Sequence, residues 1–232
     1  MAVPILHTAA DWIAIDKPTG MAVHRSRMSN QGPFVVDALK QQLGRKPYTL
    51  HRLDRPTSGV LLIGLSPQSA AMLQTALTDP KTDKSYLALV RGAWQFGDGW
   101  KVIDRPIKDD NGIMRDCHTQ ARALAASRSP RCTLVEARIR TGRFHQVRRH
   151  LQGLGYPVIG DSTHGDTRCN RAWRNDHGST RLALHCWRID LELPQGSLRI
   201  TAPPPQDLVA VWRQLPWWNE VAAELGVVMG ER

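Results

Sequence analysis

The apolar residues of this chain occur in short runs separated by turn residues, and this pattern restricts the fold more than any other feature. Residues 60–65 (VLLIGL) form a continuous apolar run, typical of a buried strand, and residues 86–90 and 132–139 predict two more strands. Residues 34–43 and the segment that starts at Pro67 have helical spacing instead. Strands mixed with helices, without a regular β-α-β rhythm, predict an α+β fold with a mostly antiparallel sheet.

Turn signals predict the rest of the organisation. Residues 93–130 give no readable element, and residues 160–181, rich in Gly, Asp, Asn and Arg, predict a long polar loop. No repeat and no change of composition divides the chain, so we expect a single domain over residues 1–232. The other predicted elements are a hairpin of residues 5–6 with 12–15, a short helix at 144–151, strands at 182–193 and 198–201, and a closing helix at 207–215.

The chain of 232 residues carries 31 Lys and Arg against 21 Asp and Glu, a net charge of +10. Such a surplus is the electrostatic signature of nucleic-acid-binding proteins, and the planar guanidinium of arginine suits phosphate. With 41% hydrophobic residues the chain can fill a core, which excludes a mainly disordered protein. No apolar run approaches the roughly 20 residues that cross a bilayer, and the start (MAVPILHTAADW) reads as no leader, so we expect a soluble, cytoplasmic protein.

The four cysteines are scattered along the chain without a C-x-x-C pair. A zinc ribbon needs closely paired thiolates, so this spacing excludes one and favours free thiols. The residues concerned are Cys117, Cys132, Cys169 and Cys186.

One carboxylate stands between two arginines in residues 51–59 (HRLDRPTSG). Pro56 keeps Arg55 out of the helical conformation, and the TSG that follows is typical of a turn, so Asp54 is expected on a constrained loop leading into the buried strand. Nearby cations lower the pKa of a carboxylate by roughly 1–3 units and keep it ionised as a nucleophile or base. A solvated, salt-bridged turn is the alternative for so short a motif.

A second basic motif occupies residues 141–151 (TGRFHQVRRHL). On a helix, Phe144 and Val147 belong to one apolar stripe, and Arg148 lies at the edge of the buried face. A partly buried guanidinium needs a carboxylate partner, and Asp54 is a suitable one. An ordinary basic surface helix is the alternative.

Two further segments offer groups for a binding site. In residues 84–92 (KSYLALVRG), Tyr86 faces away from Leu87 and Leu89 and is able to stack on a base or move a proton, with packing as the alternative. In residues 155–166, His164 lies near two aspartates, but no metal or catalytic-triad motif accompanies it, so we predict no metal site.

Taken together, these segments resemble the RluA-type family of pseudouridine synthases. HRLDRPTSG is similar to the family's catalytic aspartate motif, KSYLALVRG to its tyrosine strand, and TGRFHQVRRHL, YPVIGD and RLALH to its later motifs. Their order and approximate spacing agree over residues 11–202. The proline of the first motif, the doubled arginine at 148–149 and the segment GDSTHGDTRCNR are most similar to the tRNA pseudouridine-65 synthase subgroup.

The resemblance implies an isomerase that flips a uridine out of tRNA, at position 65, and converts it to pseudouridine without a cofactor or metal. It implies that Asp54 is the nucleophile, that Tyr86 stacks on the uracil and helps to move a proton, and that Arg148 pairs with Asp54 and orients it. The implied architecture is the pseudouridine synthase fold, a curved, mostly antiparallel mixed sheet flanked by helices, with a central basic cleft.

The resemblance also implies contacts with the RNA. Leu182 and Leu184 supply apolar contact beside the base, and Arg52 moves into the RNA where the uridine leaves its stack. We expect a monomer without an S4-like N-terminal domain, which recognises tRNA through its catalytic domain. The residues expected to bind RNA are Arg52, Arg55, Arg143, Arg149, His150, Arg168 and Arg171.

Other functions stay open on the sequence. The same chemistry on ribosomal RNA is one, and the charge alone also fits a non-catalytic RNA-binding protein or a folding chaperone. A metal-dependent nuclease is another, and it needs clustered carboxylates. Its candidate ligands are Asp104, Asp109, Asp110 and Asp116, within residues 93–130.

Overall fold

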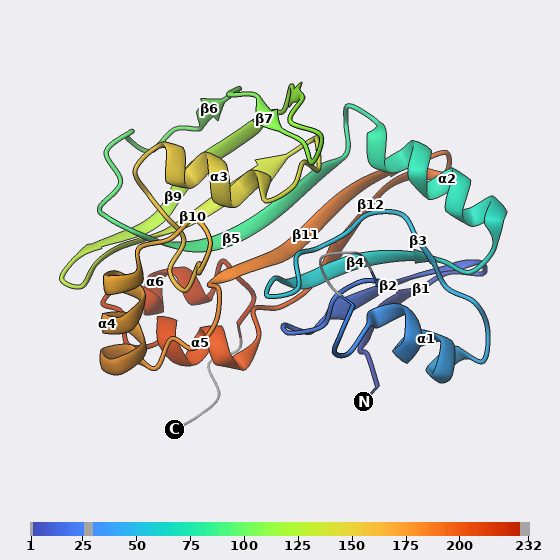
Figure 1. Cartoon of the computed structure of the whole chain (residues 1–232), viewed down its shortest axis with the longest axis horizontal. Coiled ribbons are helices and arrows are strands. Elements are labelled where there is room, and N and C mark those ends of the chain that lie inside the picture. The colour runs from blue at the N-terminus through green and yellow to red at the C-terminus, as the bar shows by residue number, and fades with distance from the viewer. Residues whose placement is uncertain (1, 26–29, 228–232) are drawn as a thin grey trace. The chain divides into compact units, whose positions relative to one another are not determined.

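The computed structural model of the chain describes residues 2–25 and 30–227 (Figure 1). The chain forms two compact units, each made of two segments. The first comprises Met1–Lys84 and Cys186–Ala202, and the second Ser85–His185 and Pro203–Arg232. Among the described residues, no helix combines the length and the apolar character that a membrane span requires.

A sheet of antiparallel pairs forms the centre of the first unit. β2 (Trp12–Lys17) pairs with β1 (Ile5–Thr8) and with β4 (Ser58–Gly64), and every residue of β4 is buried. The predicted N-terminal hairpin and the predicted strand at 60–65 are therefore confirmed. The remaining strands of this sheet are β3 (Tyr48–Thr49), which pairs with β4, the part of β11 (Leu184–Leu193) that belongs to this unit, and β12 (Gly196–Thr201), which pairs with β11.

Two helices of the first unit begin and end where the sequence predicts. α1 (Val35–Leu43) stops at Gly44, whose φ of 66° is the left-handed conformation that favours glycine at a helix end. α2 (Pro67–Thr78) starts with a proline, and Ser66 and Ser69 exchange hydrogen bonds as a capping box.

Strands of the second unit also pair with one another. The part of β5 (Asp83–Arg91) within this unit is followed by β10 (Arg131–Ile139), β9 (Thr119–Arg128) and β6 (Lys101–Ile103). β9 and β10 pair antiparallel over their whole length. β7 (Ile107–Lys108) and β8 (Met114–Arg115) form a separate hairpin. Residues 93–130, which the sequence left unread, thus contain β6, β7, β8 and β9, shown in green in Figure 1.

Four helices belong to the second unit: α3 (Gln146–Gly153), α4 (Thr167–His177), α5 (Gln206–Trp212) and α6 (Trp218–Ala222). The indole rings of Trp212 and Trp218 pack 6.4 Å apart between α5 and α6. Both side chains are buried, so the C-terminal tryptophans serve the core of this unit.

Two predictions about helices are wrong. Residues 160–181 are not one long loop, because α4 occupies 167–177: Asp166 caps its first turn, Gly178 ends it with a φ of 68°, and Trp173 buries one side. The helix predicted at 144–151 begins two residues later, because His145 has a φ of 55°, outside the helical conformation.

The predicted class, α+β with a mostly antiparallel sheet, is confirmed by these elements. The predicted strand at 86–90 lies within β5. Seven consecutive residues of β5 are buried, so both faces of this strand are covered.

Candidate functional site

Asp54 lies in the first unit, on the loop 51–57 that precedes β4. The ammonium group of Lys17, fully buried, donates a hydrogen bond to the backbone oxygen of Arg55 at 3.3 Å. The backbone oxygen of Asp54 accepts from the N–H of Thr57 at 3.0 Å, which closes a turn. The loop is therefore fixed at Asp54 and at the residues that follow it, and Asp54 is half-buried.

His51 anchors the start of the same loop to the sheet. Its Nε2 accepts a hydrogen bond from the backbone N–H of Leu62 at 3.0 Å, which requires an unprotonated nitrogen. Desolvation lowers the pKa of His51 to about 3, and the positive charge of Lys84 contributes to the shift. His51 is therefore a neutral structural residue rather than a proton donor at neutral pH.

Gly59 ends the motif because no other residue fits there. Its φ is 115°, and a Cβ atom at this position would lie 2.1 Å from the backbone oxygen of Cys186. The added Cβ would clash with backbone atoms, so no change of side-chain rotamer could relieve the clash.

The two arginines beside Asp54 differ in their surroundings. Arg52 is exposed. Arg55 donates from Nη2 to the backbone oxygen of Gln31 at 2.5 Å, and its guanidinium lies 5.9 Å from the centre of the Phe34 ring. Arg55 therefore ties the loop to the segment before α1.

Tyr86 lies on β5 and is 7% exposed. The motifs YPVIGD and RLALH run beside this strand in the second unit. The N–H of Leu89 donates to the oxygen of Ala183 at 3.0 Å, and the N–H of Ile159 donates to the oxygen of Leu89 at 2.9 Å. The predicted pocket residues Leu182 and Leu184 flank Ala183 and are 2% and 3% exposed.

Arg148, on α3, is held by a carboxylate that the sequence did not assign to it. Its Nε donates to Oδ2 of Asp161 and its Nη2 to Oδ1, both at 2.7 Å. The two side chains are 4% and 1% exposed. A buried guanidinium held by two parallel hydrogen bonds has one orientation, which a lysine could not reproduce.

Asp161 is itself surrounded by donors. Its Oδ1 accepts from the backbone N–H groups of Thr163 and His164, each at 2.9 Å. Burial raises the pKa of the Asp161 carboxyl, but the hydrogen bonds from Arg148, His164 and Thr163 outweigh it and hold the pKa below its ordinary value. The carboxylate therefore stays ionised against the guanidinium.

Asn170 of α4 fixes the backbone on both sides of this carboxylate. Its side-chain amide donates to the oxygen of Asp161 at 2.9 Å and accepts from the N–H of Gly160 at 2.8 Å. Helix α4 is thus attached directly to the residue that holds Arg148.

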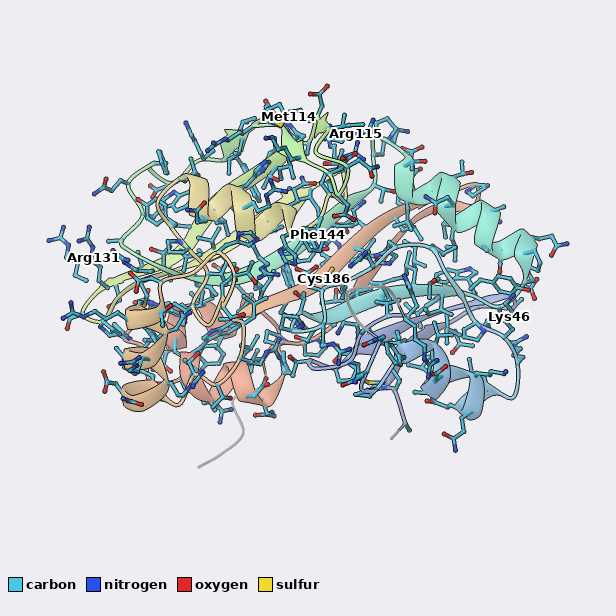
Figure 2. All side chains as sticks on the ribbon, in the orientation of Figure 1. Lys46, Met114, Arg115, Arg131, Phe144 and Cys186 are labelled. Atoms are coloured by element: carbon cyan, nitrogen blue, oxygen red, sulfur yellow. The ribbon has the colours of Figure 1, made fainter. Side chains whose placement is uncertain are left out.

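His145 and His164 meet beside this pair, with 2.9 Å between Nδ1 of the first and Nε2 of the second. The ring of His145 also stacks on Phe144, at 3.7 Å between ring centres. Phe144 is labelled in Figure 2. Because one imidazole must donate and the other accept, the contact requires at least one of them to be neutral.

Two arginines predicted to bind RNA donate hydrogen bonds to backbone oxygens in or next to the β7–β8 hairpin. Nε of Arg143 donates to the oxygen of Asp116 at 3.3 Å, and Nη1 of Arg149 donates to the oxygen of Lys108 at 3.0 Å. Each guanidinium has several donors, so these contacts leave both residues able to bind phosphate as well.

His150, also predicted to bind RNA, is 2% exposed. Its Nδ1 is 2.9 Å from Oγ1 of Thr119 and its Nε2 is 2.8 Å from the backbone oxygen of Arg105. Burial lowers the pKa of His150. The structure therefore gives His150 a role inside the second unit, which argues against the predicted contact with RNA.

The remaining predicted RNA-binding residues, Arg168 and Arg171, are exposed on α4. The residues that sequence reasoning missed, Asp161 and Asn170, lie in the segment after YPVIG. The only available signal was the position of Asp161 at the end of a motif, since nothing in the sequence links it to α3.

Two of the four aspartates considered as nuclease ligands have local partners. Asp109 accepts from the N–H groups of Asn111 and Ile113 and from Arg115, within its own turn. Asp104 pairs with His118. Within residues 2–25 and 30–227, no three His, Cys, Asp or Glu residues gather in a way that could hold a metal ion.

A family model described as RNA pseudouridylate synthase matches residues 11–153. The chain is 37% identical over 222 residues to a protein named tRNA pseudouridine synthase C from Pasteurella multocida, covering 87% of this chain and 90% of that protein. It is 37% identical over 239 residues to the Yersinia pestis protein of the same name, covering 92% and 90%.

Two solved human structures share the fold. RNA Pseudouridylate Synthase Domain Containing 4 matches with a TM-score of 0.73 at 23% identity, covering 91% of this chain and 92% of that chain. RNA Pseudouridylate Synthase Domain Containing 1 matches with a TM-score of 0.70 at 21% identity, covering 97% and 95%. The matched family segment, 11–153, includes Asp54, Tyr86 and Arg148.

Proposed function

We propose that this chain, which belongs to the RNA pseudouridylate synthase family, converts a uridine of tRNA to pseudouridine. The observation that carries the proposal is the family match over residues 11–153 together with relatives named tRNA pseudouridine synthase C that align over most of their length. The subgroup resemblance makes uridine 65 the target. We also propose that residues 1–232 act as one catalytic domain, as a monomer in the cytoplasm.

In the proposed reaction, the carboxylate of Asp54 forms a bond to ribose C1′ of the target uridine as the bond between uracil N1 and C1′ breaks, and the bond from C5 later displaces the carboxylate. The base turns and forms a bond from C5 to C1′. The hydrogen on C5 leaves as a proton, N1 gains one, and the carboxylate is released unchanged, so the product is an isomer of the substrate. The fixed loop around Asp54 supports this role, since a positioned nucleophile loses little freedom on reaching its target.

Tyr86 and Arg148 complete the proposed catalytic group. We assign Tyr86 to stacking on the uracil and to proton movement, and Arg148 to orienting Asp54. The two-point contact of Arg148 with Asp161 supports this assignment, because it fixes the direction of the guanidinium in advance. Leu182 and Leu184 are assigned to apolar contact with the base.

We assign the contacts with RNA to arginine residues. Arg52 is assigned to the space that the flipped uridine vacates, and a basic cleft is assigned to the phosphates. His150 is not included, because it is buried and bonded within the second unit. The residues assigned to phosphate are Arg55, Arg143, Arg149, Arg168 and Arg171.

Labelled transcripts test the function. Unmodified tRNA transcripts that carry tritium at C5 of uridine should release tritium into water when the protein is added, since C5 loses its hydrogen. Primer extension after carbodiimide treatment then locates the product, which we expect at uridine 65. Tritium release from ribosomal RNA transcripts but not from tRNA would show that ribosomal RNA is the substrate. Release from neither RNA would contradict the proposed pseudouridine synthase activity.

A further inference from the structure

Helix α4 presents a row of exposed arginines. Arg168, Arg171 and Arg174 follow one another at three-residue intervals, so neighbouring members lie close together along the helix. Trp173 is the residue of this helix that is buried, 5% exposed, and it fixes which side faces the protein. We call Arg168, Arg171 and Arg174 the arginine face.

The arginine face is not neutralised. Elsewhere in the second unit, Arg148 pairs with Asp161, Arg181 with Asp207 and Arg91 with Asp166. In the described part of the chain, no carboxylate forms an ion pair with a member of the arginine face. Asp166, at the start of this helix, interacts with Arg168 through its charge but forms no ion pair with it. Exposed guanidinium groups that form no ion pair attract a polyanion, and their planar forks match phosphate oxygens.

The helix that carries the arginine face is firmly held. Asp166 accepts from the N–H of Cys169 at 2.8 Å and also pairs with Arg91 of β5. Asn170 binds the backbone on both sides of Asp161. A charged surface on a fixed helix binds with less loss of side-chain and backbone freedom than one on a loop.

We propose that the arginine face binds the phosphate backbone of the substrate RNA, away from the reacting uridine. The inference rests on the proposed function and extends it in two ways. It adds Arg174 to the contacts, and it makes α4 one docking element rather than part of a polar loop. Through Asn170 and Asp161, this element is attached to the segment that holds Arg148.

Charge replacement tests the inference. The variant Arg168→Gln/Arg171→Gln/Arg174→Gln should raise the KM for a tRNA transcript by about 10- to 100-fold at about 0.15 M salt. The slope of log affinity against log salt should fall in magnitude by about 2 to 3, one phosphate contact for each arginine. The single-turnover rate at saturating RNA should stay within about twofold, because the chemistry is left intact.

Two further variants test whether the position of the charges on α4, rather than the total charge of the protein, determines binding. Lys40→Gln/Arg45→Gln/Lys46→Gln removes three exposed cations from the first unit, and it should change KM by less than about threefold. Arg168→Lys/Arg171→Lys/Arg174→Lys keeps the charge and should keep most of the affinity. An equal rise of KM in the first-unit variant, or an equal loss in the lysine variant, would overturn the inference.

Failure of the inference is distinguishable from failure of the proposed function. If the wild-type protein forms no pseudouridine in tRNA, the function is wrong. If the wild-type protein forms pseudouridine and the glutamine variant of α4 keeps the wild-type KM and salt slope, only the arginine face is wrong.

Discussion

Arg148 and Asp161 form a two-point ion pair inside the second unit, with both hydrogen bonds at 2.7 Å. Asp161 in turn accepts from two backbone N–H groups, so the carboxylate is fixed before it fixes the guanidinium. Four donors converge on one carboxylate at the junction of α3 and the 160–166 loop. The arrangement gives Arg148 a defined direction without any contribution from RNA.

Replacing Arg148 by lysine keeps the positive charge but removes the planar guanidinium that donates two parallel hydrogen bonds to Asp161. We expect Arg148→Lys to lower kcat on tRNA by about 100-fold or more, since a point charge cannot hold the same geometry, while KM changes by a few-fold. Single-turnover kinetics and RNA binding measured on the same preparation check this split. A variant that loses affinity but keeps its single-turnover rate would place Arg148 among the RNA contacts instead.

Replacing Asp161 by asparagine leaves a buried guanidinium without its counter-charge. We expect Asp161→Asn to lower the free energy of unfolding by about 3–5 kcal/mol, as for other buried pairs that lose one partner. The control is Asp37→Asn, whose carboxylate pairs with Arg25 and whose side chain is 48% exposed. Because exposed pairs contribute little, the control should cost less than about 1 kcal/mol in urea unfolding. Equal losses would show that Asp161 does not restrain a buried charge.

The low pKa of His51 makes stability depend on pH. The folded protein keeps this residue neutral down to about 3, whereas the unfolded chain takes up a proton near the ordinary pKa of about 6.5. The contribution is therefore complete above about pH 6.5 and is lost as the pH falls towards 3, by at most about 1.4 kcal/mol per pH unit.

Urea unfolding at about pH 7 and about pH 5 measures the effect. Buried His150 acts in the same direction, so the comparison is between the wild type and His51→Gln, whose amide oxygen can still accept from Leu62. We expect the variant to lose about 2 kcal/mol less than the wild type over this range. Identical losses would mean that His51 does not titrate as its surroundings indicate.

The sequence predicts those elements whose pattern is local. β4 is recognised because its apolar run is continuous, β10 because its residues alternate, and α2 because a proline marks its start. α4 was missed since Trp173 alone is buried, which leaves no helical periodicity to detect. The strands β6, β7 and β8 contain only two or three residues each, too few for an alternating pattern.

The candidate site was likewise predicted only in part from the sequence. The position of Asp54 on a constrained loop was predicted from Pro56 and the following turn residues, and the structure places it on such a loop. The partner Asp161 was not found, because it reaches Arg148 across 13 residues through the fold of the loop. Burial of His150 depends on which side of α3 faces inward, and the left-handed conformation at His145 shifts the start of that helix.

The central claim is that Asp54 carries the chemistry of a tRNA pseudouridine synthase. Tritium release from labelled tRNA transcripts should be abolished in Asp54→Asn, while the affinity for the transcript stays within about threefold of the wild type, because the amide keeps the shape of the side chain but is no nucleophile. The control Asp37→Asn, in an exposed pair with Arg25, should keep wild-type turnover. Appreciable tritium release by Asp54→Asn would contradict the account.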